Sequence, residues 1–394
     1  MEYIEMVKEI SAHLREEIIP FWMGLMDKEN GGYYGFLDYD LHLDKEAEKG
    51  CILNSRITWF FSNAYTLFKD PQYLSAATVG YRFLMEKCLD TENGGVYWSL
   101  DYKGNPLDTT KHTYNQAFAI YALSSYYEAS KDGMALSTAK SLFDLIEKNC
   151  KDDYGYLEAF TRDFKPQSNE KLSENGIIAE KTMNTILHVM EGYTELYRVS
   201  KDPQVLEAIL SILKIVHEKI YNPELKRLEV FFDREYKSLI DLHSYGHDIE
   251  TAWLLDRTLK ILGDDSLKLK FAPVIDGLTE NIYLTAFDGH SLANECEKGL
   301  VNEHRVWWVQ AEAIVGFVNG YERDITQVKY LEAAKSIWEF IKEYVCDKRP
   351  GSEWFWEVTK EGKPFYGRPI VEPWKCPYHN GRMCFELMKR NIGG

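Results

Sequence analysis

Hydrophobic and polar residues alternate along most of the chain with the period of an α-helix. In NQAFAIYALSSYYEAS, for example, Phe118, Tyr121, Ala122 and Ser125 fall at i, i+3, i+4 and i+7, so they share one helix face. The pattern predicts five helical hairpins and two single helices. The hairpins cover residues 55–68 and 72–88, 113–130 and 134–149, 181–199 and 203–220, 247–262 and 265–283, and 306–321 and 327–345; the single helices cover 2–18 and 378–390.

Glycine-marked turns and short aromatic stretches separate these hairpins. NGGYYGFLD begins at Asn30, NGGVYWSLD at Asn93 and YGYLEAF at Tyr154, and weaker copies follow in LEVFFD, FDGHSL and GSEWFWEV. The spacing is about 60 to 75 residues, which is the length of two helices and their connections. The same structural unit therefore recurs along the chain.

The two single helices can pair with each other and close the repeats into a ring. We therefore predict an all-α fold, an (α/α)6 barrel of six inner and six outer helices with short β-hairpin-like loops, in which residues 1–394 form a single domain. An open solenoid is the alternative. A ring is favoured because it buries both terminal repeats, whereas an open array needs polar caps at its ends.

Composition narrows the class of protein. The 394 residues are 45% hydrophobic, and no run of about 18 apolar residues could cross a bilayer. A net charge of −16 without a basic patch argues against nucleic acid and anionic membranes as partners. The N-terminal MEYIEMVKEISAHLREEI lacks the basic and apolar regions of a signal peptide, so we expect a cytoplasmic protein. Seven cysteines without a C-x-x-C pair argue against a disulfide framework.

Polar side chains recur near the start of the first helix of each pair. In a closed ring these helix starts meet at one end of the inner barrel, so residues far apart in sequence would line one pocket. The residues are Asn54 and Arg56, Tyr114 and Gln116, Asn184 and His188, His247 and Glu250, Trp308 and Glu312, and His379 and Arg382. We interpret His13, His42, His112, His217, His290 and His304 as packed or exposed side chains and leave His243 unassigned.

Three chemistries are open to such a pocket. Three histidines and a glutamate could bind zinc, but no H-E-x-x-H pair is present and the histidines come from three repeats, so we expect no metal. Glu250 and Glu312 could be the two carboxylates of a glycosidase, although the imidazoles would then have no role. A noncatalytic scaffold would leave all the polar helix starts without a purpose.

The third chemistry is proton transfer at a carbon next to a carbonyl, for which imidazole is suited near neutral pH. His247 and His379 could act on opposite faces of the substrate, with Glu250 orienting His247 from position i+3. Arg56 and His188 could stabilise the enediolate charge. The 10 Trp and 26 Tyr residues fit a sugar, whose apolar ring faces stack on aromatic rings.

Six motifs in order also carry a family resemblance. LNSRITWFFS, TKHTYNQAFAIY, KTMNTILHV, SYGHDIETAWLL, WWVQAEAIVGF and WKCPYHNGR resemble the N-acylglucosamine 2-epimerase superfamily, most closely its cellobiose 2-epimerases, over essentially the whole chain. The resemblance implies reversible epimerisation at C2 of the reducing-end glucose of β-1,4-linked disaccharides, without a cofactor. Cellobiose would give glucosyl-mannose and lactose would give epilactose, with isomerisation to lactulose as a side reaction.

The same resemblance assigns roles to individual residues. His247 and His379 would exchange the C2 proton, His188 and Arg56 would stabilise the enediolate, and Glu250 and Glu312 would act on the histidines and on ring opening. Tyr114 and Asn184 would hold substrate hydroxyls, with Trp307, Trp308 and Trp374 as sugar platforms. Residues 161–176 could form a lid or a solvated loop. We expect a monomer or weak homodimer, and the alternatives within the family are an N-acylglucosamine 2-epimerase or a mannose isomerase.

Overall fold

The computed structural model describes residues 3–173 and 175–390. Its helices are α1 (Tyr3–His13), α2 (Ile19–Gly24), α3 (Cys51–Phe68), α4 (Pro71–Phe83), α5 (Thr113–Ser130), α6 (Gly133–Asn149), α7 (Met183–Ser200), α8 (Pro203–Ile215), α9 (Tyr245–Leu262), α10 (Asp265–Thr285), α11 (Trp307–Arg323), α12 (Val328–Phe340) and α13 (His379–Lys389). Single π-helical turns follow α1, α4, α8 and α12, at Leu14–Ile18, Leu84–Cys88, Val216–Ile220 and Ile341–Val345.

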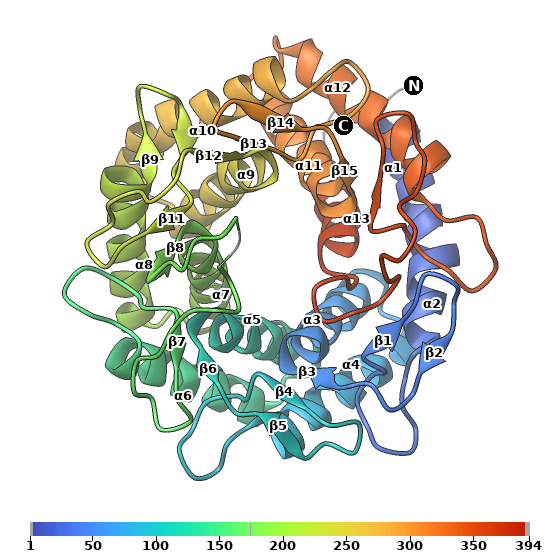
Figure 1. Ribbon diagram of the computed structural model, residues 1–394, viewed down its shortest axis with the longest axis vertical. Coiled ribbons are helices and arrows are strands. Elements are labelled where there is room, and N and C mark those ends of the chain that lie inside the picture. The colour runs from blue at the N-terminus through green and yellow to red at the C-terminus, as the bar shows by residue number, and fades with distance from the viewer. Residues whose placement is uncertain (1–2, 174, 391–394) are drawn as a thin grey trace.

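The helices form two concentric rings (Figure 1). The inner ring contains α3, α5, α7, α9, α11 and α13; each packs on the next, and α13 packs back on α3. The other helices lie outside them. The predicted (α/α)6 barrel is therefore confirmed. The inner helices are buried on nearly every side because they contact both neighbours and an outer helix, which explains apolar residues all round α5 and α11.

The N-terminal segment closes the ring against the last repeat, as the sequence predicts. Its predicted helix, residues 2–18, begins at a residue outside the described part of the chain and is helical from Tyr3 onward. The Tyr3 hydroxyl donates to the Leu387 carbonyl at 3.0 Å. The indole N–H of Trp338 donates to Glu9 at 2.9 Å, and that of Trp354 donates to His13 Nε2 at 2.8 Å. These bonds fix the contact between the two ends of the chain.

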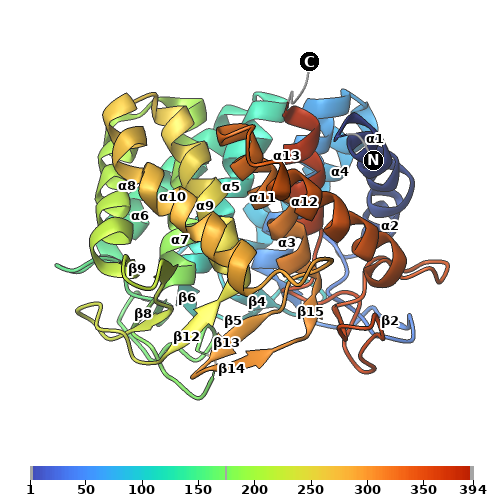
Figure 2. The same ribbon diagram turned by 90° about the horizontal axis from the view of Figure 1, so that it is seen from above.

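All strands lie at one end of the barrel, where the inner helices begin (Figure 2). The strands are β1 (Phe36–Leu37), β2 (Leu43–Asp44), β3 (Lys49–Gly50), β4 (Ser99–Leu100), β5 (Pro106–Asp108), β6 (Lys111–His112), β7 (Ala159–Phe160), β8 (Lys181–Thr182), β9 (Tyr221–Asn222), β10 (Arg227–Leu228), β11 (Phe231–Phe232), β12 (Leu242–Ser244), β13 (Glu295–Glu297), β14 (Leu300–Asn302), β15 (Arg305–Val306) and β16 (Glu357–Val358).

The strands connect each repeat to the next. The strand that precedes an inner helix pairs, antiparallel, with a strand of the following repeat: β3 with β4, β6 with β7, β8 with β11, β12 with β13, and β15 with β16. In every pair except β12 with β13 the second strand belongs to the aromatic stretch. A bridge between Leu37 and Val371 closes the set. The repeats are thus held together at the end that carries the inner-helix starts.

A buried cation stands two residues before each inner helix from α3 to α7. Lys49 pairs with Asp27 at 2.6 Å, Lys111 with Asp90 at 3.1 Å and Lys181 with Asp152 at 2.6 Å. Each acid lies in the turn that opens the aromatic stretch, so the pair ties that turn to the helix start. Arg305 with Asp288 is the α11 counterpart.

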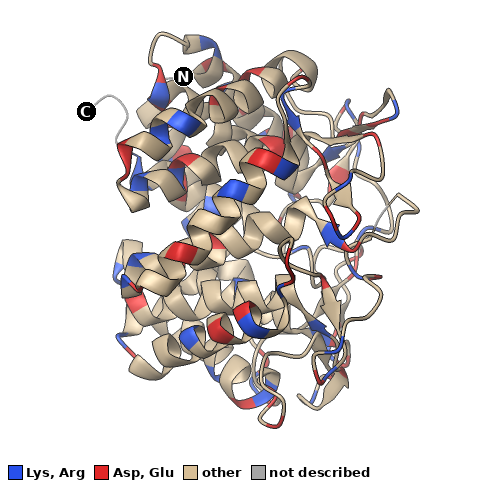
Figure 3. Ribbon diagram, turned by 90° about the vertical axis from the view of Figure 1, so that its left-hand side faces the viewer, with Lys and Arg blue, Asp and Glu red and all other residues tan. Residues whose placement is uncertain are grey.

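Charged residues of both signs are interspersed over the outer helices and loops in Figure 3. Within the described ranges, no helix combines the length and the apolar character that crossing a bilayer requires.

Candidate active site

A cavity of about 540 Å³ opens at the end of the barrel where the inner helices begin. Of the residues predicted from the sequence, those that line it are Arg56, Tyr114, Asn184, His188, His247, Trp307, Trp308, Trp374 and His379. They come from all six inner helices or the segments just before them. Glu250 and Glu312 are fully buried and do not line the cavity.

The fourth residue of α3 and of α5 has a structural role. The side-chain oxygen of Asn54 accepts the backbone N–H of Tyr33 at 3.1 Å. Gln116 accepts from Val96 N–H at 2.7 Å and donates to its carbonyl at 2.8 Å. Asn54 and Gln116, which the sequence pattern grouped with the pocket residues, therefore hold the aromatic stretches in place. Cavity residues come from the first, second, third and sixth helix positions.

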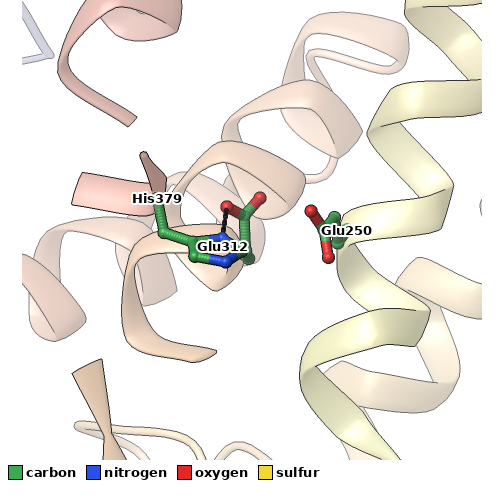
Figure 4. Close-up of side chains that lie close together, drawn as sticks. All are labelled: Glu250, Glu312 and His379. Atoms are coloured by element: carbon green, nitrogen blue, oxygen red, sulfur yellow. Dashed lines mark hydrogen bonds and ion pairs between the residues drawn. The ribbon is translucent and has the colours of Figure 1, made fainter. Parts of the chain in front are cut away.

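His379 has a carboxylate partner. Its Nδ1 lies 2.7 Å from Glu312 Oε1, as Figure 4 shows. Glu312 also accepts from Arg382 Nη2 at 2.7 Å and from the Trp253 indole at 2.9 Å. Because arginine and indole nitrogens can only donate, Glu312 acts as an acceptor throughout, and Nδ1 of His379 carries the proton. Nε2 is left to accept a proton. Burial, with Arg382 and Arg56 nearby, holds the pKa of His379 well below its usual range.

His188 has a similar arrangement on α7. Its Nδ1 lies 3.0 Å from Glu191 Oε2, and Arg382 Nη1 donates to the other oxygen of Glu191 at 2.6 Å. The Tyr378 hydroxyl also donates to Glu191. Burial lowers the pKa of His188 to about 4, against the opposing effect of Glu191. Burial disfavours the ionised form of Glu191, yet Arg382 and His188 together hold its pKa below the usual range.

His247 has a different partner from the one the sequence predicted. Its Nδ1 lies 2.7 Å from the hydroxyl of Ser244, and its ring centroid lies 4.7 Å from that of Trp308. Glu250, three residues further along α9, makes no hydrogen bond to His247 among the described residues. Glu250 Oε1 instead accepts a hydrogen bond from Arg382 Nη2. The expected i, i+3 pair is therefore not formed. The reason is that Glu250 pairs with Arg382 on α13 instead.

Arg382 is the centre of this buried charge cluster. Its guanidinium contacts Glu191, Glu250 and Glu312, which come from three different inner helices. Burial raises the pKa of Glu250 to about 8, although Arg382 opposes the shift. Glu250, Glu312 and His379 offer ligand atoms within 4.8 Å of one another. The cation that already lies against both carboxylates is the guanidinium of Arg382, so the donor set does not fit a metal ion.

Arg56 differs from Arg382 because no carboxylate pairs with it among the described residues. Its Nη2 donates to the Tyr114 hydroxyl at 2.8 Å, and its guanidinium lies 4.2 Å from the Phe118 ring centroid. Arg56 Nε, Asn184 Oδ1 and Trp307 Nε1 are buried and have no hydrogen-bond partner within the part of the chain that the structure describes. A buried positive charge and unpaired polar atoms at a cavity wall are suited to a polar ligand that develops negative charge.

The cavity has further residues that the sequence pattern missed. Ser244, His304, Trp356, Glu357 and Arg368 line it. Their lining positions lie outside the inner helices, in strands and loops, where no helical period marks them. His304, expected to be packed or exposed, lies in the wall with its Nδ1 3.0 Å from Glu357. For Trp356 the sequence did contain a signal, because this residue lies in the aromatic stretch GSEWFWEV.

The 161–176 segment lies beside the cavity. Lys171 and Leu172 line the wall, and Lys171 Nζ pairs with Asp108 at 2.5 Å. Asn169, which is buried, accepts from His112 Nε2 at 3.0 Å. His112 also caps α5, because its Nδ1 accepts the backbone N–H of Tyr114 at 3.3 Å. One imidazole therefore connects this segment to the helix that carries Tyr114.

Comparison with known proteins places this site in a family. The model of the N-acylglucosamine 2-epimerase family matches residues 32–380. The chain belongs to that family. It is 51% identical to a cellobiose 2-epimerase of Ruminococcus albus over 98% of this chain and 99% of the relative. The structure of cellobiose 2-epimerase from Bacillus thermoamylovorans B4167 superposes with a TM-score of 0.94 at 46% identity, covering 98% and 99% of the two chains.

Within the N-acylglucosamine 2-epimerase family, this chain groups with the cellobiose 2-epimerases and is accordingly an isomerase. A D-mannose isomerase of Marinomonas mediterranea is 22% identical over 96% of each chain. This chain is thus much more similar in sequence to the cellobiose 2-epimerases than to the D-mannose isomerase.

Proposed function

We propose that the chain catalyses reversible epimerisation at C2 of the reducing-end glucose in β-1,4-linked disaccharides. It would convert cellobiose to glucosyl-mannose and lactose to epilactose. One observation carries the mechanism: His247 and His379, from α9 and α13, flank one indole in the cavity wall. The Trp308 ring centroid lies 4.7 Å from His247 and 5.3 Å from His379. Family membership supports the substrate class.

The proton transfers follow from this arrangement. In the open-chain aldehyde, Nε2 of one imidazole removes the C2 proton, and the C–H electron pair forms an enediolate with its charge on O1. The other imidazole, as imidazolium, returns a proton to the opposite face of C2. One proton leaves and one arrives, so the product is an isomer of the substrate. The enediolate charge favours the imidazolium form beside it, against the effect of burial.

Arg56 and His188 stabilise the enediolate in this mechanism. The Arg56 guanidinium is buried and unpaired by carboxylates among the described residues, so its charge is available to the substrate oxygen. His188 directs its Nδ1–H to Glu191, so it can donate to the enediolate oxygen from Nε2 only as imidazolium, a form that the Glu191 carboxylate and the enediolate charge both favour. Tyr114 and Asn184 hold substrate hydroxyls, and Trp307, Trp308 and Trp374 are the sugar platforms. Protonation at C1 instead of C2 would give the ketose.

The test is an NMR assay in heavy water with cellobiose or lactose and no added cofactor. We expect deuterium at C2 together with a mannose-type reducing end, and loss of both signals in His247→Ala and His379→Ala. Free glucose would identify a glycosidase. If the disaccharide is unchanged, free mannose and N-acetylglucosamine are the next substrates, and the assignment to disaccharides is wrong.

A further inference from the structure

Ser244 stands at the N-cap of α9 but does not cap it. An N-cap serine normally accepts a backbone N–H of the first helical turn through its hydroxyl. Ser244 has the extended backbone of an N-cap residue, yet its side chain makes no capping bond. Its Oγ instead lies 2.7 Å from Nδ1 of His247. The hydroxyl is directed to an imidazole where a helix would ordinarily use it.

Two other inner helices, α7 and α5, use the side chain at this position for capping. Thr182 caps α7 through the backbone N–H of Thr185 at 3.0 Å, and His112 caps α5 through Tyr114. Ser244 also lines the cavity and is 6% exposed, so its bond to His247 is largely shielded from water. The contrast indicates that the Ser244 hydroxyl serves the site and not the helix.

We propose that Ser244 is the positioning residue of His247: its hydroxyl oxygen accepts a hydrogen bond from Nδ1–H and so keeps Nε2 free to exchange the C2 proton. This inference rests on the proposed function of His247. If the hydroxyl donated to Nδ1 instead, Nε2 of the neutral ring would carry a hydrogen and could not remove the C2 proton. The Nδ1–H to Oγ bond persists when Nε2 is protonated, so Ser244 neither gains nor loses a proton.

The two acid/base groups are then unequal. His379 has a carboxylate at Nδ1 and His247 has a neutral hydroxyl. A carboxylate stabilises imidazolium more than a hydroxyl does. The other titratable groups that act on His247 are His188 from α7, which disfavours its charged form, and Glu312 from α11, which favours it. His247 therefore has no carboxylate at Nδ1 to stabilise its imidazolium form, whereas His379 has Glu312 at Nδ1 but also Arg382 and Arg56 nearby, which disfavour its charged form.

Ser244→Ala and Ser244→Thr test the inference by steady-state kinetics with cellobiose. We expect Ser244→Ala to lower kcat about threefold to tenfold, the contribution of one neutral hydrogen bond, with KM changed less than about twofold. The pH profile of kcat should shift with it, because His247 loses the acceptor of its Nδ1 proton. Ser244→Thr, which retains a hydroxyl, should restore both. Unchanged kcat and pH profile in Ser244→Ala would overturn the inference.

Two controls separate this role from others. Asp70→Ala removes a cap that is formed, since Asp70 accepts from Gln72 N–H at 2.9 Å on outer helix α4. It should lower Tm by about 1–3 °C and leave kcat unchanged, whereas Ser244→Ala should lower kcat and shift its pH profile. A loss of Tm in Ser244→Ala with an unchanged kcat and pH profile would show a purely structural role and overturn the inference. His247→Ala is the second control: if it still epimerises, the proposed function of His247 fails, and the role of Ser244 fails with it.

Discussion

Glu312 Oε1 accepts two hydrogen bonds, one from Nδ1–H of His379 and one from Nη2 of Arg382, each with a nitrogen–oxygen distance of 2.7 Å. The guanidinium keeps that oxygen in place and the carboxylate in turn orients the imidazole. The histidine that we propose as an acid/base group on the last inner helix is thus positioned by a carboxylate on α11 and an arginine on its own helix.

Glu312→Gln and Glu250→Gln should therefore differ in effect. An amide at 312 can turn its NH2 toward Nδ1, which would move the ring proton to Nε2 and remove the base. We expect kcat for cellobiose to fall about 10²–10⁴-fold in Glu312→Gln. Glu250, with its pKa raised to about 8 by burial, contacts Arg382 and not a histidine, so Glu250→Gln should change kcat much less. Equal losses in the two variants would contradict this assignment.

Asn169→Ala should weaken substrate binding more than catalysis. Asn169 accepts from His112 at 3.0 Å and donates to the Ala179 carbonyl at 3.2 Å, so it fixes the segment that brings Leu172 to the cavity. We expect KM for cellobiose to rise several-fold and proteolysis within 161–178 to become faster. The matched control is Lys165→Ala, an exposed change in the same segment, which should leave both measurements unchanged. Wild-type KM in Asn169→Ala would count against a role of the segment in binding.

Lys49→Met should be strongly destabilising. It leaves Asp27 buried without its cation, and breaking a buried pair on one side typically costs about 3–5 kcal/mol. Urea unfolding measures the loss. The double variant Asp27→Asn/Lys49→Met should recover much of it, because no charge is then left unpaired. Lys165→Met, from an exposed pair with Asp163, should leave the free energy of unfolding unchanged.

Glu158→Gln should make thermal stability less dependent on pH. Burial raises the pKa of Glu158 to about 8, above its value of about 4.5 in the unfolded chain. The folded state then binds the extra proton, so its stabilisation is complete below pH 4.5 and is lost as pH rises through 8. We expect Tm of the variant, relative to the parent, to rise by about 2 °C or more from pH 5 to pH 8. A constant difference in Tm over that range would contradict the shifted pKa.

The sequence by itself determined the repeat, the ring and the part of the cavity wall that the inner helices and the segment before α13 contribute. Helical periodicity and the glycine-marked turns are local signals, and one repeat length constrains where every inner helix begins. The positions of Arg56, His188, His247 and His379 in the repeat are therefore enough to predict that they lie at one end of the barrel. The unpaired helices at the two ends of the chain predicted closure, because a ring leaves no exposed terminal repeat.

Only the tertiary structure decided which neighbour each polar side chain contacts. Glu250 is three residues from His247 in sequence, yet it bonds to Arg382, 132 residues away. Asn54 and Gln116 look like site residues in the repeat but hold the backbone of the aromatic stretches. A helix position fixes the direction of a side chain only to within one face, whereas a hydrogen bond depends on a few tenths of an ångström between elements distant in sequence. The packing of the inner helices and of the segments between them sets those distances.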